Sequence, residues 1–151
     1  MPSVSPSNLI EIILGSISAS GGSGDFVSDS TRTHPRKFLV NYQEESFSIW
    51  IYVWSLTHGG RVTLPNEYRI QMTSVQSPLQ VNPLGYTILL GYFSELEVFA
   101  GFDLSRHQTF TSGSPSVQID FQTLKQAITD GLSFQRKANQ EIAIGIRPDH
   151  L

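Results

Sequence analysis

The sequence contains no cysteine among its 151 residues, and this absence excludes several kinds of protein. A disulfide-stapled fold, a thiolate nucleophile and a zinc site built from cysteine all require that residue. The sequence also lacks an apolar run of about 20 residues, the length that spans a bilayer. Its N-terminal stretch has no positively charged segment of the kind that opens a signal peptide. These absences predict a cytoplasmic protein with no membrane partner.

Histidine is scarce, and its spacing offers no metal site. The four histidines lie at positions 34, 58, 107 and 150, without the HxH or HExxH spacing of metal ligands. No serine occupies a G-x-S-x-G elbow. We therefore expect no metal, no cofactor and no catalytic residue. One enzymatic alternative stays open: a nuclease-type domain that uses Asp103 and His107, which are close together in the segment GFDLSRHQTF.

Charged residues make up only 15% of the chain, and the formal net charge is −3. A negative total argues against a nonspecific nucleic-acid coat protein. The positive charges are nevertheless clustered, because Arg32, His34, Arg36 and Lys37 lie within six residues that include no acid. For a site-specific DNA reader, local clustering matters more than net charge. This segment is therefore a candidate phosphate-binding arm.

The length fits one domain with a substantial core. Residues 7–16 carry apolar side chains at helical spacing, and the Ser/Gly-rich stretch 15–30 is expected to be a flexible connection. We therefore divide the chain into an N-terminal helix and linker, residues 1–30, and a β-barrel recognition domain, residues 31–151.

The strand pattern predicts a mainly β fold. In residues 47–54 apolar side chains fall on both sides of the strand, so both faces must be covered, as in a closed or nearly closed barrel. A helix over 120–130 is expected to begin at the cap Asp120 and to end at Gly131. A turn is expected at 136–140. Other strands are expected at 38–42, 68–75, 86–93, 96–102, 117–119 and 141–146. The predicted fold is a small antiparallel (pseudo)barrel with two peripheral helices.

Residues 68–75 alternate in polarity, with Arg69 and Gln71 on the outer face. Arginine and glutamine make paired hydrogen bonds to base edges, and phosphate oxygens are bound by arginine, serine and threonine. Two polar loops, THGGR and RHQTFTS, supply further donors. Taken alone, each of these motifs is also typical of an ordinary solvated strand or loop. The predicted base-reading residues are His58, Arg61, Arg69, Gln71, Arg106 and His107. The predicted phosphate-binding residues are Arg32, Arg36, Lys37, Thr109 and Ser112.

The aromatic residues of 47–54 allow two interpretations. Aromatic side chains stack on extruded bases, but a stripe of them on a strand is more often core. We assign Trp50 and Tyr52 to the core. Trp54, the one nearest the following loop, and then Tyr68 are the candidates for a base pocket.

The segments THGGR…EYRIQ and VFAGFDLSRHQTFTSGSPSVQI, followed by a helix and by EIAIGIRPD, resemble accessory domains of prokaryotic restriction-modification systems. Within that group the resemblance is to B3-like and PUA-like β-barrel modules, and it covers residues 36–149. It implies a non-catalytic module of a restriction or defence protein that recognises a specific or modified site on double-stranded DNA, methylated or not. A nuclease or methylase domain of the same or a partner protein is implied as well.

The B3-like version implies two DNA-facing arms, which we place at 31–37 and in the loops 57–61 or 106–112. A protein-interaction domain stays open as a further alternative.

Overall fold

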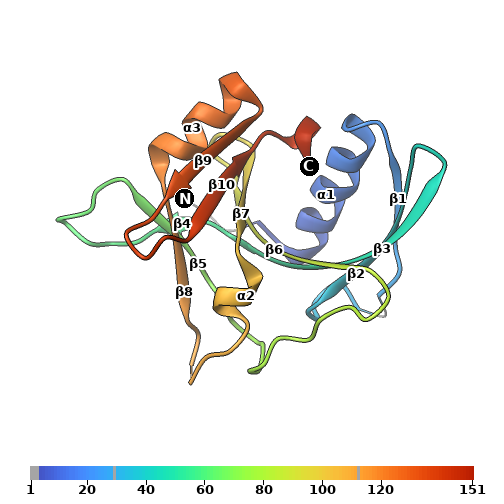
Figure 1. Ribbon diagram of the computed structural model, residues 1–151, viewed down its shortest axis with the longest axis horizontal. Coiled ribbons are helices and arrows are strands. Elements are labelled where there is room, and N and C mark those ends of the chain that lie inside the picture. The colour runs from blue at the N-terminus through green and yellow to red at the C-terminus, as the bar shows by residue number, and fades with distance from the viewer. Residues whose placement is uncertain (1–3, 29, 112) are drawn as a thin grey trace.

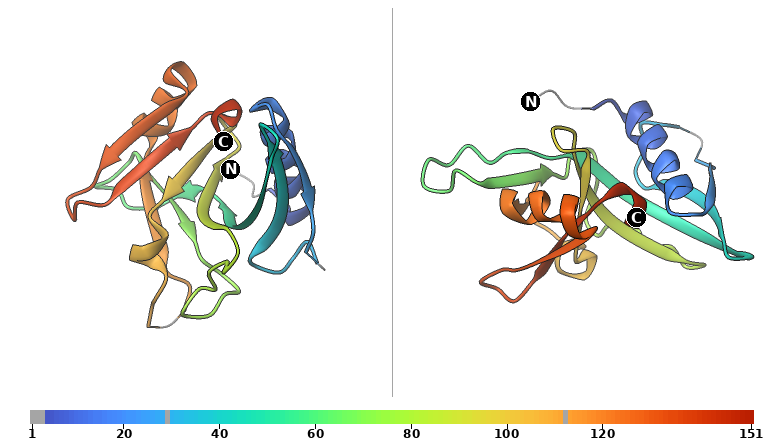
Figure 2. Two further views of the ribbon diagram at one scale, coloured as in Figure 1. Left: turned by 45° about the vertical axis from the view of Figure 1, so that its right-hand side comes forward. Right: turned by 90° about the horizontal axis from the view of Figure 1, so that it is seen from above.

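The computed structural model describes residues 4–28, 30–111 and 113–151. The chain forms a seven-stranded sheet with the order β1-β2-β3-β6-β7-β10-β9 and a three-stranded sheet with the order β4-β5-β8. Helix α1 (Pro6–Ala19) covers one face of the large sheet, and the small sheet and helix α3 (Phe121–Asp130) lie on its other side (Figures 1 and 2). The prediction of a mainly β domain is confirmed.

The remaining elements follow the expected order along the chain. The hairpins predicted at 38–54 and 86–102 are both present. The strands of the large sheet are β1 (Ser23–Phe26), β2 (Arg36–Tyr42), β3 (Glu45–Ser55), β6 (Tyr86–Phe93), β7 (Val98–Phe102), β9 (Leu132–Arg136) and β10 (Ile142–Ile146). The small sheet consists of β4 (Thr57–His58), β5 (Glu67–Gln71) and β8 (Ser116–Asp120). The short helices are α2 (Leu104–His107) and the 3₁₀ helix η1 (Pro148–His150).

The centre of strand β3 is covered on both faces, as its two-sided apolar pattern predicts, whereas Trp50, which was expected in the core, is only half-buried and lies beneath Lys37. Ile51 and Val53 are buried in the core beneath α1, whereas Tyr52 belongs to the second core, between the large sheet and the small sheet with α3. The pairing of β3 with β6 differs from the expected antiparallel one, because these two strands run parallel. A parallel pair requires a long crossover, and here that crossover, residues 56–85, carries β4 and β5.

Several local features differ from the predictions. Part of the Ser/Gly-rich stretch is not a flexible connection, because α1 extends to Ala19 and β1 pairs with β2. Gly24 explains the close packing: a Cβ there would lie 3.2 Å from Cδ1 of Ile17, so glycine lets β1 approach the helix. The turn expected at 136–140 is present, with the Gln140 N–H donating to the carbonyl of Lys137 at 2.9 Å, but the residues before it form the unpredicted strand β9, which pairs with β10. The strand expected at 68–75 ends at Gln71. The division of the chain at residue 30 stays a prediction.

Residues 4–28, 30–111 and 113–151 include no helix with the length and apolar character needed to cross a membrane.

Helix α3 has the caps that the sequence predicts, and these allow a first test. The Asp120 side chain accepts a hydrogen bond from the backbone N–H of Gln122 at 2.8 Å, and the Gly131 N–H donates to the carbonyl of Ala127. We expect Asp120→Ala to lower the free energy of unfolding by about 1 kcal/mol, because an N–H of the first turn loses its acceptor. Urea denaturation measures this. Asp120→Asn retains a side-chain oxygen and should cost clearly less; equal losses would contradict the capping role.

Candidate nucleic-acid interface

A cavity of about 340 Å³, here named the polar cleft, brings together residues that are far apart in the sequence. Its walls are the start of α1, the segment that leads into β2, the end of β3, and β4 and β5 with the chain that follows β5. Four residues of the predicted sets line it: Arg32, Arg36, Trp54 and Gln71. The cleft thus contains members of all three predicted sets: phosphate-binding, base-reading and base-pocket residues.

His34 belongs to the predicted basic arm 31–37, although to none of the predicted sets of contact residues, and it forms part of the cleft wall. Its ring lies against Trp54 with the centroids 4.3 Å apart. Its Nε2 atom lies 3.0 Å from the carbonyl oxygen and 3.2 Å from the backbone nitrogen of Val53. Burial, with a smaller contribution from the charge of Arg36, lowers the pKa of His34 to about 3. At neutral pH this ring is therefore an uncharged wall and not a cation.

Arg36 does not lie on an exposed arm, and that expectation was wrong. Arg36 is only 3% exposed. Its Nε and Nη1 atoms have no hydrogen-bond partner in the described part of the chain. Strand alternation explains the burial, because Arg36 shares the α1-facing side of β2 with Phe38 and Val40. Lys37 points to the opposite side and lies over the Trp50 ring at 4.5 Å from its centroid. Arg32 is exposed at the cleft.

The outer face of the small sheet adjoins the cleft through Gln71. As predicted, β5 buries Ile70, and Met72 just beyond the strand is buried too. The Arg69 guanidinium donates to Oε1 of the exposed Gln71 at 3.1 Å. Pairing places Gln118 of β8 beside Arg69. This face therefore presents adjacent amide and guanidinium groups.

Tyr68, the second base-pocket candidate, lies apart from Trp54. Its ring packs against Phe93 and Phe121, with centroid distances of 4.8 and 6.0 Å, as part of the core between the sheets. Only Trp54 of the two lines the polar cleft.

The 58–61 loop uses its predicted donors internally. Arg61 forms a bidentate ion pair with Glu67, with Nη2 2.7 Å from Oε2. The Nε2 atom of His58 lies 2.8 Å from the carbonyl oxygen of Pro65, and Nδ1 accepts from the N–H of Gly60. The positive charge of Arg61 is thus already paired with an acid.

The 103–111 segment is likewise bound to its own neighbours. Arg106 donates to the carbonyl of Asn139 at 2.8 Å, and His107 Nε2 lies 2.7 Å from a carboxylate oxygen of Glu141. Glu141 is buried, and Lys137 approaches its other oxygen at 3.5 Å. Burial of Lys137 lowers its pKa, and Glu141 partly offsets this. Thr109 is exposed, and Ser112 lies outside the described residues.

Asp103 and His107 do not form the acid–base pair that the enzyme alternative requires. Asp103 instead caps α2, accepting from the backbone N–H of Ser105 at 3.1 Å and from its hydroxyl. In residues 4–28, 30–111 and 113–151, no group of three or more His, Asp or Glu side chains is arranged to hold a metal ion.

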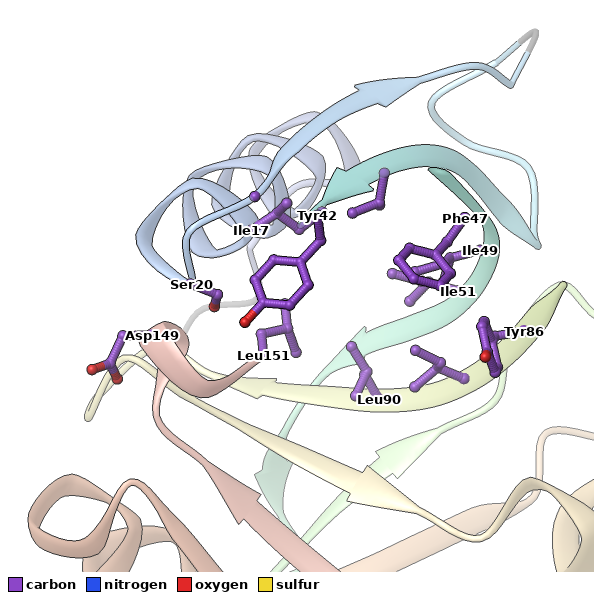
Figure 3. Close-up of a pocket in the computed structure, with 13 residues that line it drawn as sticks. Ile17, Ser20, Tyr42, Phe47, Ile49, Ile51, Tyr86, Leu90, Asp149 and Leu151 are labelled. Carbon is purple, nitrogen blue, oxygen red and sulfur yellow. The ribbon is translucent and has the colours of Figure 1, made fainter. Parts of the chain in front are cut away.

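A second cavity is apolar and lies on the α1 side of the large sheet. It has a volume of about 440 Å³ between the end of α1, β2, β3, β6 and the last residues of the chain. Figure 3 shows Tyr42, Phe47, Tyr86 and Leu151 around it. Tyr86 is 58% exposed. We name this feature the apolar groove.

The family of this domain is identified by one comparison with known proteins. Residues 47–151 match the family model described as Methylase-associated X1, and the chain belongs to this family. This confirms the restriction-modification association that the sequence resemblance implied. No curated protein and no solved structure matches the chain. The matched segment includes Trp54 and Gln71 of the cleft, whereas Arg32, His34 and Arg36 precede it.

Proposed function

We propose that this domain recognises a specific or modified site on double-stranded DNA for its associated methylase, and that it has no catalytic activity of its own. The observation that carries the proposal is the convergence of Arg32, Trp54 and Gln71 on one cleft. The Arg69–Gln71 pair extends that cleft as a polar strand face. The interface is thus assembled from three separate parts of the chain.

Each group has a distinct role in this proposal. Arg32 and Lys37 contact phosphates, with Thr109 and Ser112 as further phosphate contacts. Arg69 and Gln71 approach base edges, for which their paired donors and acceptors are suited. Trp54 offers a ring for a base, in the manner of B3-like and PUA-like modules. His58, Arg61, Arg106 and His107 contact bases only if DNA displaces their present partners.

Duplex binding is the direct test, and we expect it to be salt-sensitive. The two cationic phosphate contacts, Arg32 and Lys37, predict a slope of about −1.8 in a plot of log K against log salt, hence a fall of roughly 12-fold between about 50 and 200 mM salt. Fluorescence anisotropy with methylated and unmethylated duplexes measures this. Failure to bind any duplex of a randomised panel at low salt would count decisively against the proposal.

Two kinds of variant separate phosphate contacts from base contacts. Arg32→Ala should weaken binding to all sequences alike, because a phosphate carries no base information. Arg69→Ala or Gln71→Ala should relax sequence preference, at about 1–3 kcal/mol per paired base contact. Selection from a random duplex library, followed by sequencing, measures both the overall loss of binding and the change in sequence preference.

Arg136→Ala is the matched control for these variants, because Arg136 is exposed on β9 and does not line the cleft. All four variants should remain folded. If Arg69→Ala unfolds the domain, Arg69 is structural and its base-reading role is lost.

A protein-interaction role is the second candidate, and the apolar groove favours it. Large exposed apolar patches commonly mark partner surfaces, and the partner class that the family indicates is a methylase. Tyr86→Arg should reduce co-purification with the methylase of the same system while leaving duplex binding unchanged. Unaltered co-purification would exclude the groove as the docking surface.

A further inference from the structure

Arg36 is an unusual residue for the inner wall of a cleft. It is 3% exposed, and two of its guanidinium nitrogens, Nε and Nη1, have no hydrogen-bond partner within residues 4–28, 30–111 and 113–151. Buried polar groups in proteins are nearly always paired, and a buried charge without a partner is strongly unfavourable. An arginine side chain stays protonated at all physiological pH values. Arg36 is therefore a buried cation for which the described residues supply no partner to Nε and Nη1.

Within residues 4–28, 30–111 and 113–151, no carboxylate lines the polar cleft around Arg36. His34 is uncharged at neutral pH, so it neither neutralises Arg36 nor adds to its charge. Arg32 adds a second cation at the cleft, and the N-terminal end of α1 lies beside it through Pro6. The partial positive charge of a helix N-terminus acts in the same direction.

We propose that the inner part of the polar cleft binds a phosphate group, with Arg36 as its principal ligand and Arg32 as the second. The planar guanidinium pairs with tetrahedral oxyanions through two parallel hydrogen bonds. The cleft also offers the hydroxyls of Thr57 and Thr73 as donors. The evidence for this site is the geometry of Arg36. Phosphate binding therefore does not require that the domain recognise duplex DNA.

The burial of Arg36 selects the kind of phosphate. A phosphate within a duplex is flanked by sugars on both sides, and the duplex is too wide to bring it to a side chain this deeply enclosed. A phosphate monoester or inorganic phosphate has a free end and fits a cavity of about 340 Å³. The ligand class is therefore a phosphate monoester, whether the 5′-phosphate of a DNA end or that of a free nucleotide.

Phosphate binding is tested on the whole 151-residue chain with inorganic phosphate as the first probe. We expect phosphate to raise the Tm of the wild-type protein relative to chloride at equal ionic strength. Arg36→Met should abolish this rise. In phosphate-free buffer it should also leave the Tm unchanged or higher, because it removes an unpaired buried charge. Arg136→Met, an exposed arginine outside the cleft, is the matched control and should behave as wild type.

Titration calorimetry then distinguishes the two possible sources of the phosphate, a DNA end and a free nucleotide. Deoxynucleoside 5′-monophosphates and a 5′-phosphorylated oligonucleotide are each compared with the forms that lack the phosphate, and the phosphate should tighten binding at least tenfold. A preference for the oligonucleotide identifies a DNA end, and equal affinity identifies a free nucleotide.

If Arg36→Met does not fold, Arg36→Lys and direct titration of the wild-type protein still test the site. A wild-type protein that shows no phosphate-specific shift, or an Arg36→Met protein that retains the shift, overturns it. Loss of duplex binding with retained phosphate binding would refute only the proposed function.

Discussion

Replacing Glu141 by alanine is expected to lower the free energy of unfolding by about 3 kcal/mol, the largest effect that we predict for a single side chain. The Glu141 carboxylate is 1% exposed and binds His107 at 2.7 Å and Lys137 at 3.5 Å. Its removal leaves the half-buried Lys137 ammonium without a counter-charge, and such losses cost about 3–5 kcal/mol when the pair is fully enclosed. Urea denaturation at pH 7 measures the change.

Two variants control this experiment. Glu141→Gln keeps the shape and one acceptor oxygen, so we expect a smaller loss of about 1–2 kcal/mol. Glu95→Ala removes an exposed carboxylate in the turn between β6 and β7 and should change stability by less than about 0.5 kcal/mol. If Glu141→Ala proves as mild as Glu95→Ala, the His107–Glu141–Lys137 cluster does not stabilise the fold, and His107 is free to act elsewhere.

Acidification is expected to cost about 2 kcal/mol between pH 7.5 and 5 through His34 alone. The folded-state pKa of His34 is about 3, against an ordinary value of 6.5. Between these values the unfolded chain binds a proton that the folded chain does not, so stability falls as the pH decreases below about 6.5. The slope for one proton is about 1.4 kcal/mol per pH unit. Above pH 7.5 this group contributes no further change.

A His34→Gln variant isolates the effect. Glutamine retains a polar group for the Val53 backbone but does not titrate, so the stability of the variant should depend less steeply on pH. We expect the difference between the two proteins, measured by urea denaturation, to shift by about 2 kcal/mol in favour of the variant on going from pH 7.5 to 5. A constant difference across this range would show that the His34 ring accepts a proton without cost.

The fold could be predicted from sequence where local pattern decides it. Each correctly predicted feature depends on residues that are close together in the sequence. Examples are the two-sided apolar pattern of β3, the alternation of β5 and the caps of α3. The parallel pairing of β3 with β6 could not be predicted, because it depends on how residues 56–85 fold back across the sheet. The strand β1 was missed because its glycines resemble a linker, although they serve close packing against α1.

The candidate site was predictable in its composition but not in its geometry. Arg32, Trp54 and Gln71 do converge, yet Arg61 and His107 are engaged by Glu67 and Glu141. The His107–Glu141 contact spans more than 30 residues, beyond the reach of any local motif. A signal for the burial of Arg36 did exist, since it shares a strand face with the apolar Phe38 and Val40. The cluster of positive charge obscured that pattern.

The position of β3 has a consequence for the order in which the chain folds. Its antiparallel partner β2 is adjacent in sequence, so that hairpin closes a short loop. Its parallel partner β6 becomes available only after the whole crossover has been synthesised and brought back. Contacts between distant segments form slowly because loop closure must precede them. We therefore expect the β2–β3 hairpin to form early, and the large sheet to be completed only when β6 pairs with β3.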